Sequence, residues 1–496
     1  MSDAELGYER LGKAKLTLVD VVAQSVGFMG PVFSAAFLIP LIAGVGASGK
    51  GAGIATPFAV LLAAVGMFAL GWIVAQYAKR VHAAGSLYDY VSLGLGGKVG
   101  GVGGWLYYGG TTVLASAIAV LIGGLIHDNL FTVDPAAPGV VHMASPLPIW
   151  AWSVLFVAAV FLIMYLGVQI STRVQLGLSL ISAVVVLAFA IDVIIKLGSA
   201  NSLKAFNPSE AADGWSGILF GVMYGVLIFV GFETAANLAE ETAEPKRSIP
   251  RAVLLTLIIA TGFYVILAYT QVAGFGFDLA TILGPAAAAP LFALGSPEAA
   301  GGYGSDLILK ILIVVVILDV MAVGLGAAVA STRGIFALAR DRRIPAALAR
   351  VSKSRGTPVG AIAFVSLWSL AMVLLTRWRP VTFALPGGVP AYFAMFAWLS
   401  TFGGFALVVV YGVMALGAFR GLSGHPNMRG VYVASVVGVA ISLGAVYGAL
   451  YKVPSPTKLV VYYVAAWLVL GIVVVLTAKG REPASNVLGD LRSEGV

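Results

Sequence analysis

Long hydrophobic segments recur along the whole of this 496-residue chain, and short polar linkers separate them. Hydrophobic residues make up 60% of the sequence and charged residues only 10%, whereas soluble globular proteins carry about 25% charged residues. An apolar run of about 20 residues can cross the hydrocarbon core of a bilayer as a helix. The sequence therefore predicts an all-α polytopic membrane protein. A transmembrane barrel would need alternating segments of about ten residues, and the chain shows none.

We predict twelve transmembrane helices, which cover residues 17–43, 56–78, 101–126, 149–168, 174–197, 214–238, 252–274, 306–333, 359–376, 391–418, 430–451 and 457–478. Lys and Arg collect in the cytoplasmic loops of membrane proteins. With both termini placed in the cytoplasm, 22 Lys and Arg residues lie on the inner side and 7 on the outer side. The chain is thus expected to be a multi-pass protein of the plasma membrane, a bacterial inner membrane, with cytoplasmic tails over 1–16 and 479–496.

Several functional classes are disfavoured by what the sequence lacks. The net charge of +8 follows the inner loops instead of forming a stripe, so a nucleic-acid partner is not expected. The chain has no cysteine, and its four histidines show no metal-ligand spacing, so we expect no metal, no cofactor and no enzymatic activity. The segment GVGASGK at 44–50 matches the first part of a nucleotide-binding loop, but Gly51 follows it and no strand precedes it. An ATP-driven pump is therefore disfavoured.

Two of the predicted helices are interrupted near the middle of the membrane. The first contains QSVGFMGPVFSA with Gly30 and Pro31, and the sixth contains Gly231 and Glu233. Proline removes a backbone donor and glycine permits unwound backbone, although both residues are also common in membrane helices. Helices 1 and 6 are five apart, so they cross the membrane in opposite directions. Paired broken helices in inverted halves indicate the binding site of a secondary transporter.

The stretch FVGFETAANLAEETAEPKRSIPRA, at 229–252, closely resembles the sixth-helix signature of the amino acid–polyamine–organocation (APC) transporter superfamily. Three further stretches resemble family motifs in the same order: AAGSLYDYVSLGLG at 83–96, GVQISTRVQ at 167–175 and STRGIFALARDRRIPAALARVSKSRGTPVGA at 331–361. The resemblance to an amino acid permease implies a 5+5 inverted repeat with discontinuous helices 1 and 6. Its two halves would cover 17–197 and 214–418, with two peripheral helices over 430–478. Within the signature, Pro250 is expected to start helix 7.

The resemblance also implies where the substrate binds, between the unwound middles of helices 1 and 6. Half-helix N-termini there would offer N–H groups to a carboxylate, and carbonyls at the half-helix C-termini would accept from an ammonium group. The candidate substrate-binding residues lie on helices 1, 3 and 6 and are Ser25, Gly27, Phe28, Met29, Gly30, Tyr107, Tyr108, Leu227, Phe229, Gly231 and Phe232.

The chain departs from the family pattern at several of these positions. Helix 1 reads MGPVF where a glycine-dense segment is common, and Pro31 removes one N–H donor for a carboxylate. Leu227 stands at the aromatic gate and offers no quadrupole to an ammonium group. Ser182 stands where sodium-independent members often carry a lysine, which leaves that cation position vacant. Val323 and Ala327 stand where hydroxyls would bind sodium. Neither a built-in cation nor a sodium site is therefore evident.

Two carboxylates, Glu233 and Asp319, are predicted to lie deep in the membrane, where a charge costs about 3 kcal/mol on insertion scales. We hypothesise that one of them carries a coupled proton. The alternative for Asp319 is a structural role, protonated and hydrogen-bonded to a neighbouring helix. At the cytoplasmic end of helix 6, Glu240 and Glu241 are gate candidates that could pair with Arg340, the alternative being a solvated charged loop.

These features predict a secondary active transporter that works by alternating access. It would move an amino acid or a related small amine-bearing solute across the plasma membrane, by proton coupling or exchange. A polyamine or amino-alcohol carrier is the alternative substrate class, favoured by the missing carboxylate donor and the deep acids. A sensor or channel built on the same fold is a further alternative. The expected partners are the small-molecule substrate and membrane lipids.

Overall fold

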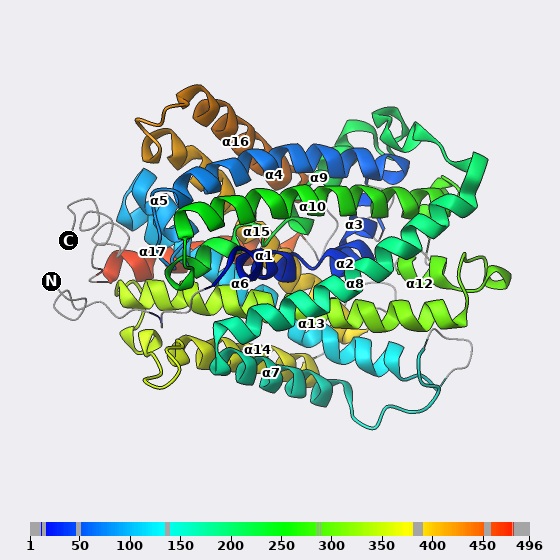
Figure 1. The fold of residues 1–496 in the computed structure, drawn as a ribbon, viewed down its shortest axis with the longest axis horizontal. Coiled ribbons are helices and arrows are strands. Elements are labelled where there is room, and N and C mark those ends of the chain that lie inside the picture. The colour runs from blue at the N-terminus through cyan, green and yellow to red at the C-terminus, as the bar shows by residue number, and fades with distance from the viewer. Residues whose placement is uncertain are drawn as a thin grey trace.

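The structure, a computed structural model, consists almost entirely of helices (Figure 1). It describes residues 11, 16–45, 51–133, 139–284, 287, 289–379, 390–450, 458–478 and 480. Within these residues, β-type pairing is limited to isolated bridges, one of which joins Leu16 to Thr242. Nearly all of the predicted tails 1–16 and 479–496, and most of segment 44–50, lie outside the described residues.

The helices follow one another as α1 (Leu18–Met29), α2 (Pro31–Phe33), α3 (Ile39–Ala43), α4 (Thr56–Ala78), α5 (Leu87–Leu95), α6 (Gly97–Leu125), α7 (Ile149–Leu166), α8 (Val168–Leu197), α9 (Gly214–Ile228), α10 (Pro245–Gly274), α11 (Leu279–Ile282), α12 (Pro290–Gly295), α13 (Asp306–Arg340), α14 (Val359–Trp378), α15 (Ala391–Gly421), α16 (Met428–Leu450) and α17 (Leu459–Thr477).

Eleven helical segments among the described residues are long and apolar enough to cross a membrane. The sixth predicted span contains α9, which is apolar but only 15 residues long. The prediction of an all-α polytopic membrane protein is therefore confirmed. The count of twelve spans and the inverted repeat stay predictions.

The prediction that Pro250 starts the seventh span is wrong. Helix α10 begins at Pro245, and Pro250 lies inside it. Proline is tolerated at the first helical position, which suits Pro245. Pro250 cannot donate to the carbonyl of Lys246, but Lys246 is exposed in the first turn of the helix. Water can therefore replace the missing hydrogen bond.

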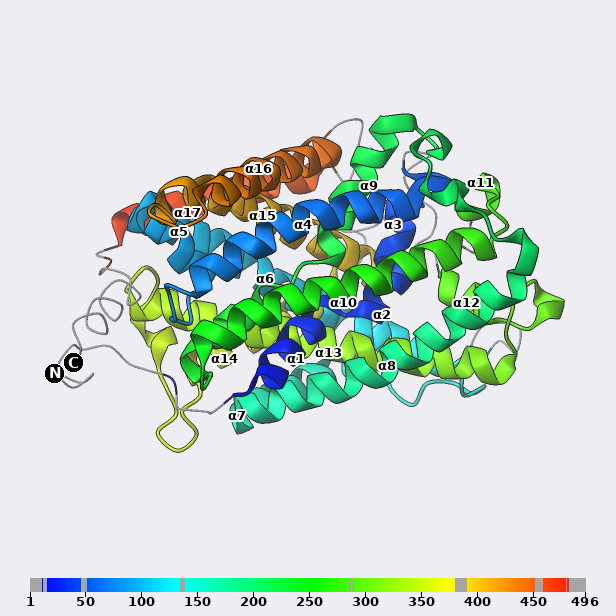
Figure 2. The ribbon, with the colours of Figure 1, turned by 45° about the horizontal axis from the view of Figure 1, so that its top comes forward.

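The first broken helix lies in the centre of the bundle (Figures 1 and 2), where α1 packs against α8, α10 and α13. Two glycines permit this close contact. A Cβ atom at Gly27 would lie 2.6 Å from Gln175 Oε1, and one at Gly326 would lie 2.8 Å from the Phe28 Cα. Small residues allow the backbones of membrane helices to approach each other closely, so α1 packs tightly against its neighbours.

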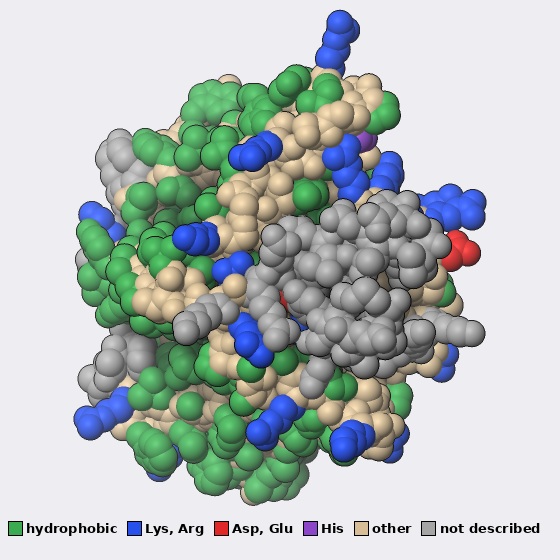
Figure 3. Space-filling model, turned by 90° about the vertical axis from the view of Figure 1, so that its left-hand side faces the viewer, with side chains coloured by type: hydrophobic (Ala, Val, Ile, Leu, Met, Phe, Trp, Pro, Cys, Tyr) green, Lys and Arg blue, Asp and Glu red, His purple; other side chains and the backbone are tan. Residues whose placement is uncertain are grey.

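One end of the bundle collects the basic side chains, and we refer to it as the basic end. It comprises the end of α4, the start of α10 and the end of α13, with Lys79, Arg80, Lys246, Arg247, Arg340 and Arg343. Figure 3 looks onto this end and shows Lys and Arg side chains spread among hydrophobic ones, with few acidic side chains visible. The sequence predicts that these residues face the cytoplasm, and this orientation stays a prediction.

The predicted interruption of helix 1 is present at Gly30. Helix α1 ends at Met29, and Gly30 adopts the left-handed conformation with φ 54° and ψ 77°. Helix α2 then starts at Pro31, and a π-helical turn follows over Ser34–Leu38. The Gln271 side chain of α10 donates to the Ala35 carbonyl at 2.7 Å, which satisfies one backbone acceptor within this irregular stretch.

The predicted interruption of helix 6 is also present. Helix α9 ends at Ile228, residues 229–233 form turns, and a 3-10 helix continues over Thr234–Glu241. Gly231 has φ 114°, and a Cβ atom there would lie 3.0 Å from the Met29 nitrogen. The two breaks therefore touch each other, and glycine is required where they meet.

We predict that Gly30→Ala destabilises the protein. The new Cβ would lie 2.0 Å from Val323 Cγ2, and left-handed backbone costs a non-glycine residue about 1–2 kcal/mol. Thermal unfolding in detergent should start at a lower temperature than in the wild type. Gly262→Ala in α10 is the matched control, because no atom beyond its chain neighbours and its own helix backbone lies within 4 Å of its Cβ position. Equal stability of Gly30→Ala and wild type would contradict the strained turn.

Candidate functional site

A small cavity of 40 Å³ lies where the two breaks meet. Its walls come from the broken helices and from α6, α13 and α15, and most of its lining side chains are apolar. Ser34 and Ser400 supply the hydroxyl groups among the described lining residues. Ligand pockets usually measure about 300–1,000 Å³, so in this conformation the cavity is too small for a ligand of ordinary size.

The N–H groups at the start of α2 are bound by Asp319 of α13. Asp319 Oδ2 accepts from the Val32 nitrogen at 2.9 Å and from the Phe33 nitrogen at 2.8 Å, and the side chain is fully buried. The sequence predicts that these donors face a substrate carboxylate. The structure corrects this expectation, because a carboxylate of the protein itself occupies them.

The break in helix 6 is held by its own carboxylate, Glu233. Its Oε1 atom accepts from the hydroxyl groups of Tyr107 on α6 and, at 2.8 Å, Tyr411 on α15. Its Oε2 atom accepts from the Gly231 nitrogen at 3.2 Å. Tyr107 is therefore bonded to the acid and is not among the residues that line the cavity, contrary to the prediction of a wall residue.

Ser25 connects the two breaks directly. Its hydroxyl donates to the Phe232 carbonyl at 3.0 Å and accepts from the Ala235 nitrogen at 3.0 Å. Tyr108 lies further toward the basic end, where its hydroxyl donates to the Gly85 carbonyl at 2.8 Å and accepts from Asn237 at 2.7 Å. Like Tyr107, Tyr108 supports the helix-6 segment and does not line the cavity.

Three of the predicted substrate-binding residues line the cavity, namely Phe28, Met29 and Leu227. Gly27, Gly30 and Gly231 shape the breaks, as described above. The rings of Phe229 and Phe232 instead contact Tyr264 and Tyr411, with centroid separations of 5.3 and 5.8 Å. The two phenylalanines are therefore packing residues in this conformation.

Sequence reasoning missed most of the remaining lining residues, which are Phe33, Ser34, Leu38, Leu114, Ile118, Val230 and Ser400. Val323 and Ala327 also line the cavity, although the sequence marked them only as missing sodium ligands. They lie four and eight residues after Asp319, on the same face of one helix. Their helical spacing from Asp319 was the signal in the sequence that could have identified them as residues of the cavity wall.

The vacant cation position at Ser182 is filled by a helix contact. The buried hydroxyl donates to the Leu178 carbonyl at 2.8 Å and to the Val315 carbonyl at 2.7 Å. Ser182 thus joins α8 to α13 and is not among the residues that line the cavity. Across the described part of the chain, no group of three or more His, Asp or Glu residues is arranged to hold a metal ion.

The gate candidates Glu240 and Glu241 lie buried at the inner edge of the basic end, where Glu240 contacts the third candidate, Arg340. Arg340 Nη1 donates to Glu240 Oε1 at 2.9 Å, and the same carboxylate oxygen accepts from the Ala84 nitrogen at 2.9 Å. Glu241 pairs with the fully buried Arg333 at 3.3 Å, a partner that the sequence did not predict. The solvated-loop alternative is wrong for these acids, because Glu240 has 9% and Glu241 4% of its side chain exposed.

The chain before helix 1 fastens this closed end. The Leu16 nitrogen donates to the Glu241 carbonyl at 3.0 Å, and the Ala243 nitrogen donates to the Leu16 carbonyl at 3.1 Å. Tyr88 of α5 donates to Asp341 at 2.9 Å. Segments from four parts of the sequence therefore close the cavity toward the basic end.

A cluster of phenylalanines closes the cavity on its other side. Phe33 contacts Phe37 and Phe396 with centroid separations of 5.9 Å each, and Phe37 contacts Phe393 at 6.5 Å. This seal is apolar, whereas the seal toward the basic end consists of ion pairs and hydrogen bonds. The two sides can therefore open by different movements.

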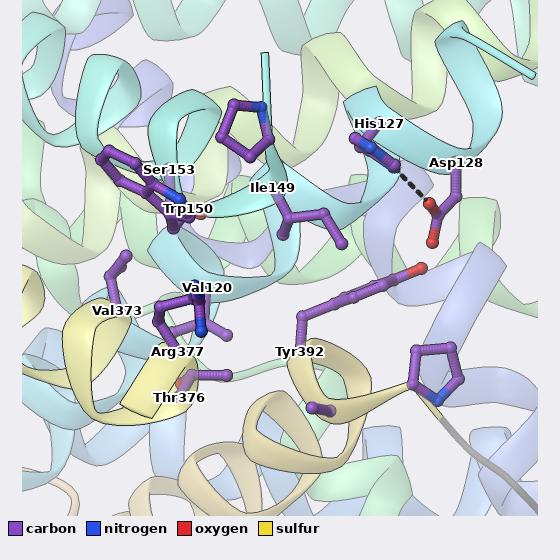
Figure 4. A pocket seen from close by; sticks show the side chains of 13 residues that line it. Val120, His127, Asp128, Ile149, Trp150, Ser153, Val373, Thr376, Arg377 and Tyr392 are labelled. Atoms are coloured by element: carbon purple, nitrogen blue, oxygen red, sulfur yellow. Dashed lines mark hydrogen bonds and ion pairs between the residues drawn. The ribbon is translucent and has the colours of Figure 1, made fainter. Parts of the chain in front are cut away.

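A larger cavity of 500 Å³ lies beyond the end of α6, between the π-helical turn Ile126–Leu130, α7, α14 and α15. Figure 4 shows the His127–Asp128 pair and Arg377 on different sides of it. Its lining includes no residue of α1, α2, α3 or α9. It is consequently separate from the point where the broken helices meet, and we regard the smaller central cavity as the candidate substrate site.

Known proteins are similar to this sequence over long stretches. The chain is 25% identical to the branched-chain amino acid permease BcaP of Bacillus subtilis over 344 residues, which cover 66% of this chain and 69% of the relative. It is 27% identical over 380 residues to the vacuolar cationic amino acid transporter 4 of Arabidopsis thaliana, covering 74% of this chain and 59% of the relative. An uncharacterized transporter of Mycobacterium tuberculosis is 29% identical over 395 residues, covering 77% of this chain and 79% of the relative.

The sequence profile of the amino acid permease family matches residues 25–482, from the middle of α1 to beyond the end of α17. The matched region contains both breaks, the central cavity and the closed basic end. The chain therefore belongs to the amino acid permease family of the APC superfamily, as its four motifs indicated.

Proposed function

We propose that this membrane protein is a secondary active transporter that binds a small amine-bearing solute in the central cavity. The observation that carries the proposal is the meeting of two helix breaks around one cavity that is closed on both sides. The names of the relatives, a branched-chain amino acid permease and a cationic amino acid transporter, support substrates of this class. The plasma membrane is its proposed location, with the basic end and both termini in the cytoplasm.

The backbone of helix 1 can recognise an ammonium group. Pro31 has no N–H for the Gly27 carbonyl, and the Val32 nitrogen binds Asp319 instead of the Phe28 carbonyl. Among the described residues, neither carbonyl accepts a hydrogen bond from a backbone N–H group of a turn, loop or helix cap. Carbonyls at the end of a half-helix carry partial negative charge, so these two oxygens suit a cationic donor.

Alternating access would proceed by opening one seal at a time. The proposed inward step breaks the pairs of Glu240 and Glu241 with their arginines, and the proposed outward step separates the phenylalanine cluster. A channel needs a continuous path, whereas the described structure is sealed on both sides of the cavity. A shut channel would be sealed in the same way, so exchange of labelled for unlabelled solute in counterflow is the measurement that distinguishes a carrier from a channel or a sensor.

We predict that Glu233 or Asp319 carries a coupled proton. In proteoliposomes, uptake of a labelled substrate should depend on pH in the wild type, and Glu233→Gln or Asp319→Asn should lose this dependence. Each amide keeps an acceptor oxygen for the buried donors but cannot exchange a proton. Asp192→Asn is the control, because Asp192 lies in an exposed ion pair with Lys196 and is not among the described residues that line the cavity. Unchanged pH dependence in both test variants would refute proton coupling through these acids.

We also predict that Glu240→Gln opens the basic end. Removing one charge from a buried ion pair costs about 3–5 kcal/mol, so the closed state should become less populated. The chain has no native cysteine, and Ala239 is 5% exposed. Ala239→Cys in inverted membrane vesicles should therefore react about tenfold faster or more with an impermeant maleimide when Glu240→Gln is present.

Ser354→Cys in the exposed loop at the basic end provides the control for reagent access. It should react at the same rate with and without Glu240→Gln. If Ala239→Cys shows no acceleration while this control reacts normally, the Glu240–Arg340 pair is not part of a gate.

A further inference from the structure

The start of α2 has no backbone donor left for a substrate. Pro31 carries no N–H, Val32 and Phe33 both donate to Asp319, and the Ser34 nitrogen donates to the Gly30 carbonyl at 2.8 Å. The positive end of a half-helix attracts an anion. At this break the anion is already supplied by α13, and it lies 287 residues along the chain from Val32.

The backbone N–H groups at the break in helix 6 are also bound by groups of the protein. The Gly231 nitrogen donates to Glu233, and the Ala235 nitrogen donates to Ser25. The Phe232 and Thr234 nitrogens donate to the carbonyls of Phe229 and Gly231, at 3.2 and 3.0 Å. The donors that two broken helices would offer to a carboxylate are thus bound by groups of the protein.

The charges around the cavity also disfavour a substrate carboxylate. Asp319 binds the backbone of the lining residue Phe33, and Glu233 binds the Gly231 nitrogen next to the lining residue Val230. Both acids are fully buried behind the cavity wall, and no Lys or Arg is among the described residues that line it. An entering carboxylate would lie near two buried acids, with the N–H groups of both breaks already bound and no cation in the lining to compensate it, which disfavours its negative charge. An ammonium group would lie near the same acids and near the carbonyl of Phe28, which lines the cavity.

We infer that Asp319 takes the place of a substrate carboxylate and that the transported solute is an aliphatic primary amine without a carboxylate. This inference rests on the proposed function and assigns its substrate class. The apolar lining suits a short aliphatic body, and the hydroxyls of Ser34 and Ser400 can accommodate a hydroxyl group, as in an amino alcohol. Asp319 is thereby a residue that determines specificity.

A matched set of three compounds tests the inference on the purified full-length protein. Leucine, leucinol and 3-methylbutylamine share one side chain and one amino group, and they differ only in a carboxylate, a hydroxymethyl group or neither. Ligands that bind only the folded state raise its apparent stability. The amine and the amino alcohol should shift the melting temperature at concentrations at least about tenfold lower than leucine, and both should drive counterflow in proteoliposomes.

Substitution of Asp319 provides the second arm. Asp319→Gly vacates the Val32 and Phe33 N–H groups, so leucine should gain at least about tenfold in affinity relative to 3-methylbutylamine. Asp319→Asn keeps an acceptor oxygen on those donors and should continue to reject leucine. Because the Asn variant preserves size and hydrogen bonding, it stays informative if the Gly variant does not fold. Asp192→Asn should leave the ligand preference unchanged.

The outcomes separate the two proposals. If wild type binds and exchanges leucine as well as the amine or better, the inference is overturned while the transport function stands. An unchanged ligand preference in a folded Asp319→Gly variant also overturns it. If no member of the set, and no other amino acid or amine, is bound or exchanged, the proposed function itself fails and the inference fails with it.

Discussion

Backbone groups that lose their helical partners in the middle of a membrane must find new ones within the protein. Hydrocarbon offers no hydrogen bonds, and each unsatisfied group costs several kcal/mol. Here the partners come from distant helices: Asp319 of α13, Gln271 of α10 and Ser25 of α1. Each break is satisfied only when the other helices are in place, so the breaks depend on the assembled bundle.

The same contacts connect chemistry to movement in the proposed transport cycle. Hydrogen bonds to an ionised carboxylate are about twice as strong as neutral ones. A proton on Asp319 would weaken its hold on α2, and a proton on Glu233 would weaken its bonds to Tyr107 and Tyr411. Protonation of the acid would then shift the equilibrium between two positions of the half-helix. A group that satisfies a broken helix is well placed to control it.

Local features of the sequence were sufficient to predict the helices and both breaks. Length and hydropathy located the spans, and Gly30, Pro31 and Gly231 marked the interruptions because their backbone properties are independent of context. The prediction that Pro250 starts a helix was wrong because the effect of this proline does depend on its context. A proline in the first turns of a helix loses one hydrogen bond that water can replace, so its presence does not decide where that helix begins.

Contacts between distant residues could not be predicted in this way. A single sequence shows that Asp319 and Glu241 are acids, but Val32 and Arg333 become their partners only through the packing of helices. The same limit explains the assignment of Tyr107, an aromatic residue on helix 3 that could equally line a cavity or brace an acid. Periodicity within one helix was the exception, since Val323 and Ala327 follow from Asp319 by spacing alone.

The placement of Asp319 reverses the usual relation between a helix terminus and its ligand. A half-helix N-terminus with free N–H groups attracts anions. When a carboxylate of the protein already binds those N–H groups, they cannot bind a second anion, and the carboxylate itself repels it. Specificity at this site would then follow from donors that the protein has already used. Pro31 lacks an N–H group, and Asp319 binds the N–H groups of the next two residues. The Gly27 and Phe28 carbonyls therefore lose their helical donors and can still accept a hydrogen bond. One break would therefore reject a carboxylate and accept an ammonium group by the same local change in hydrogen bonding.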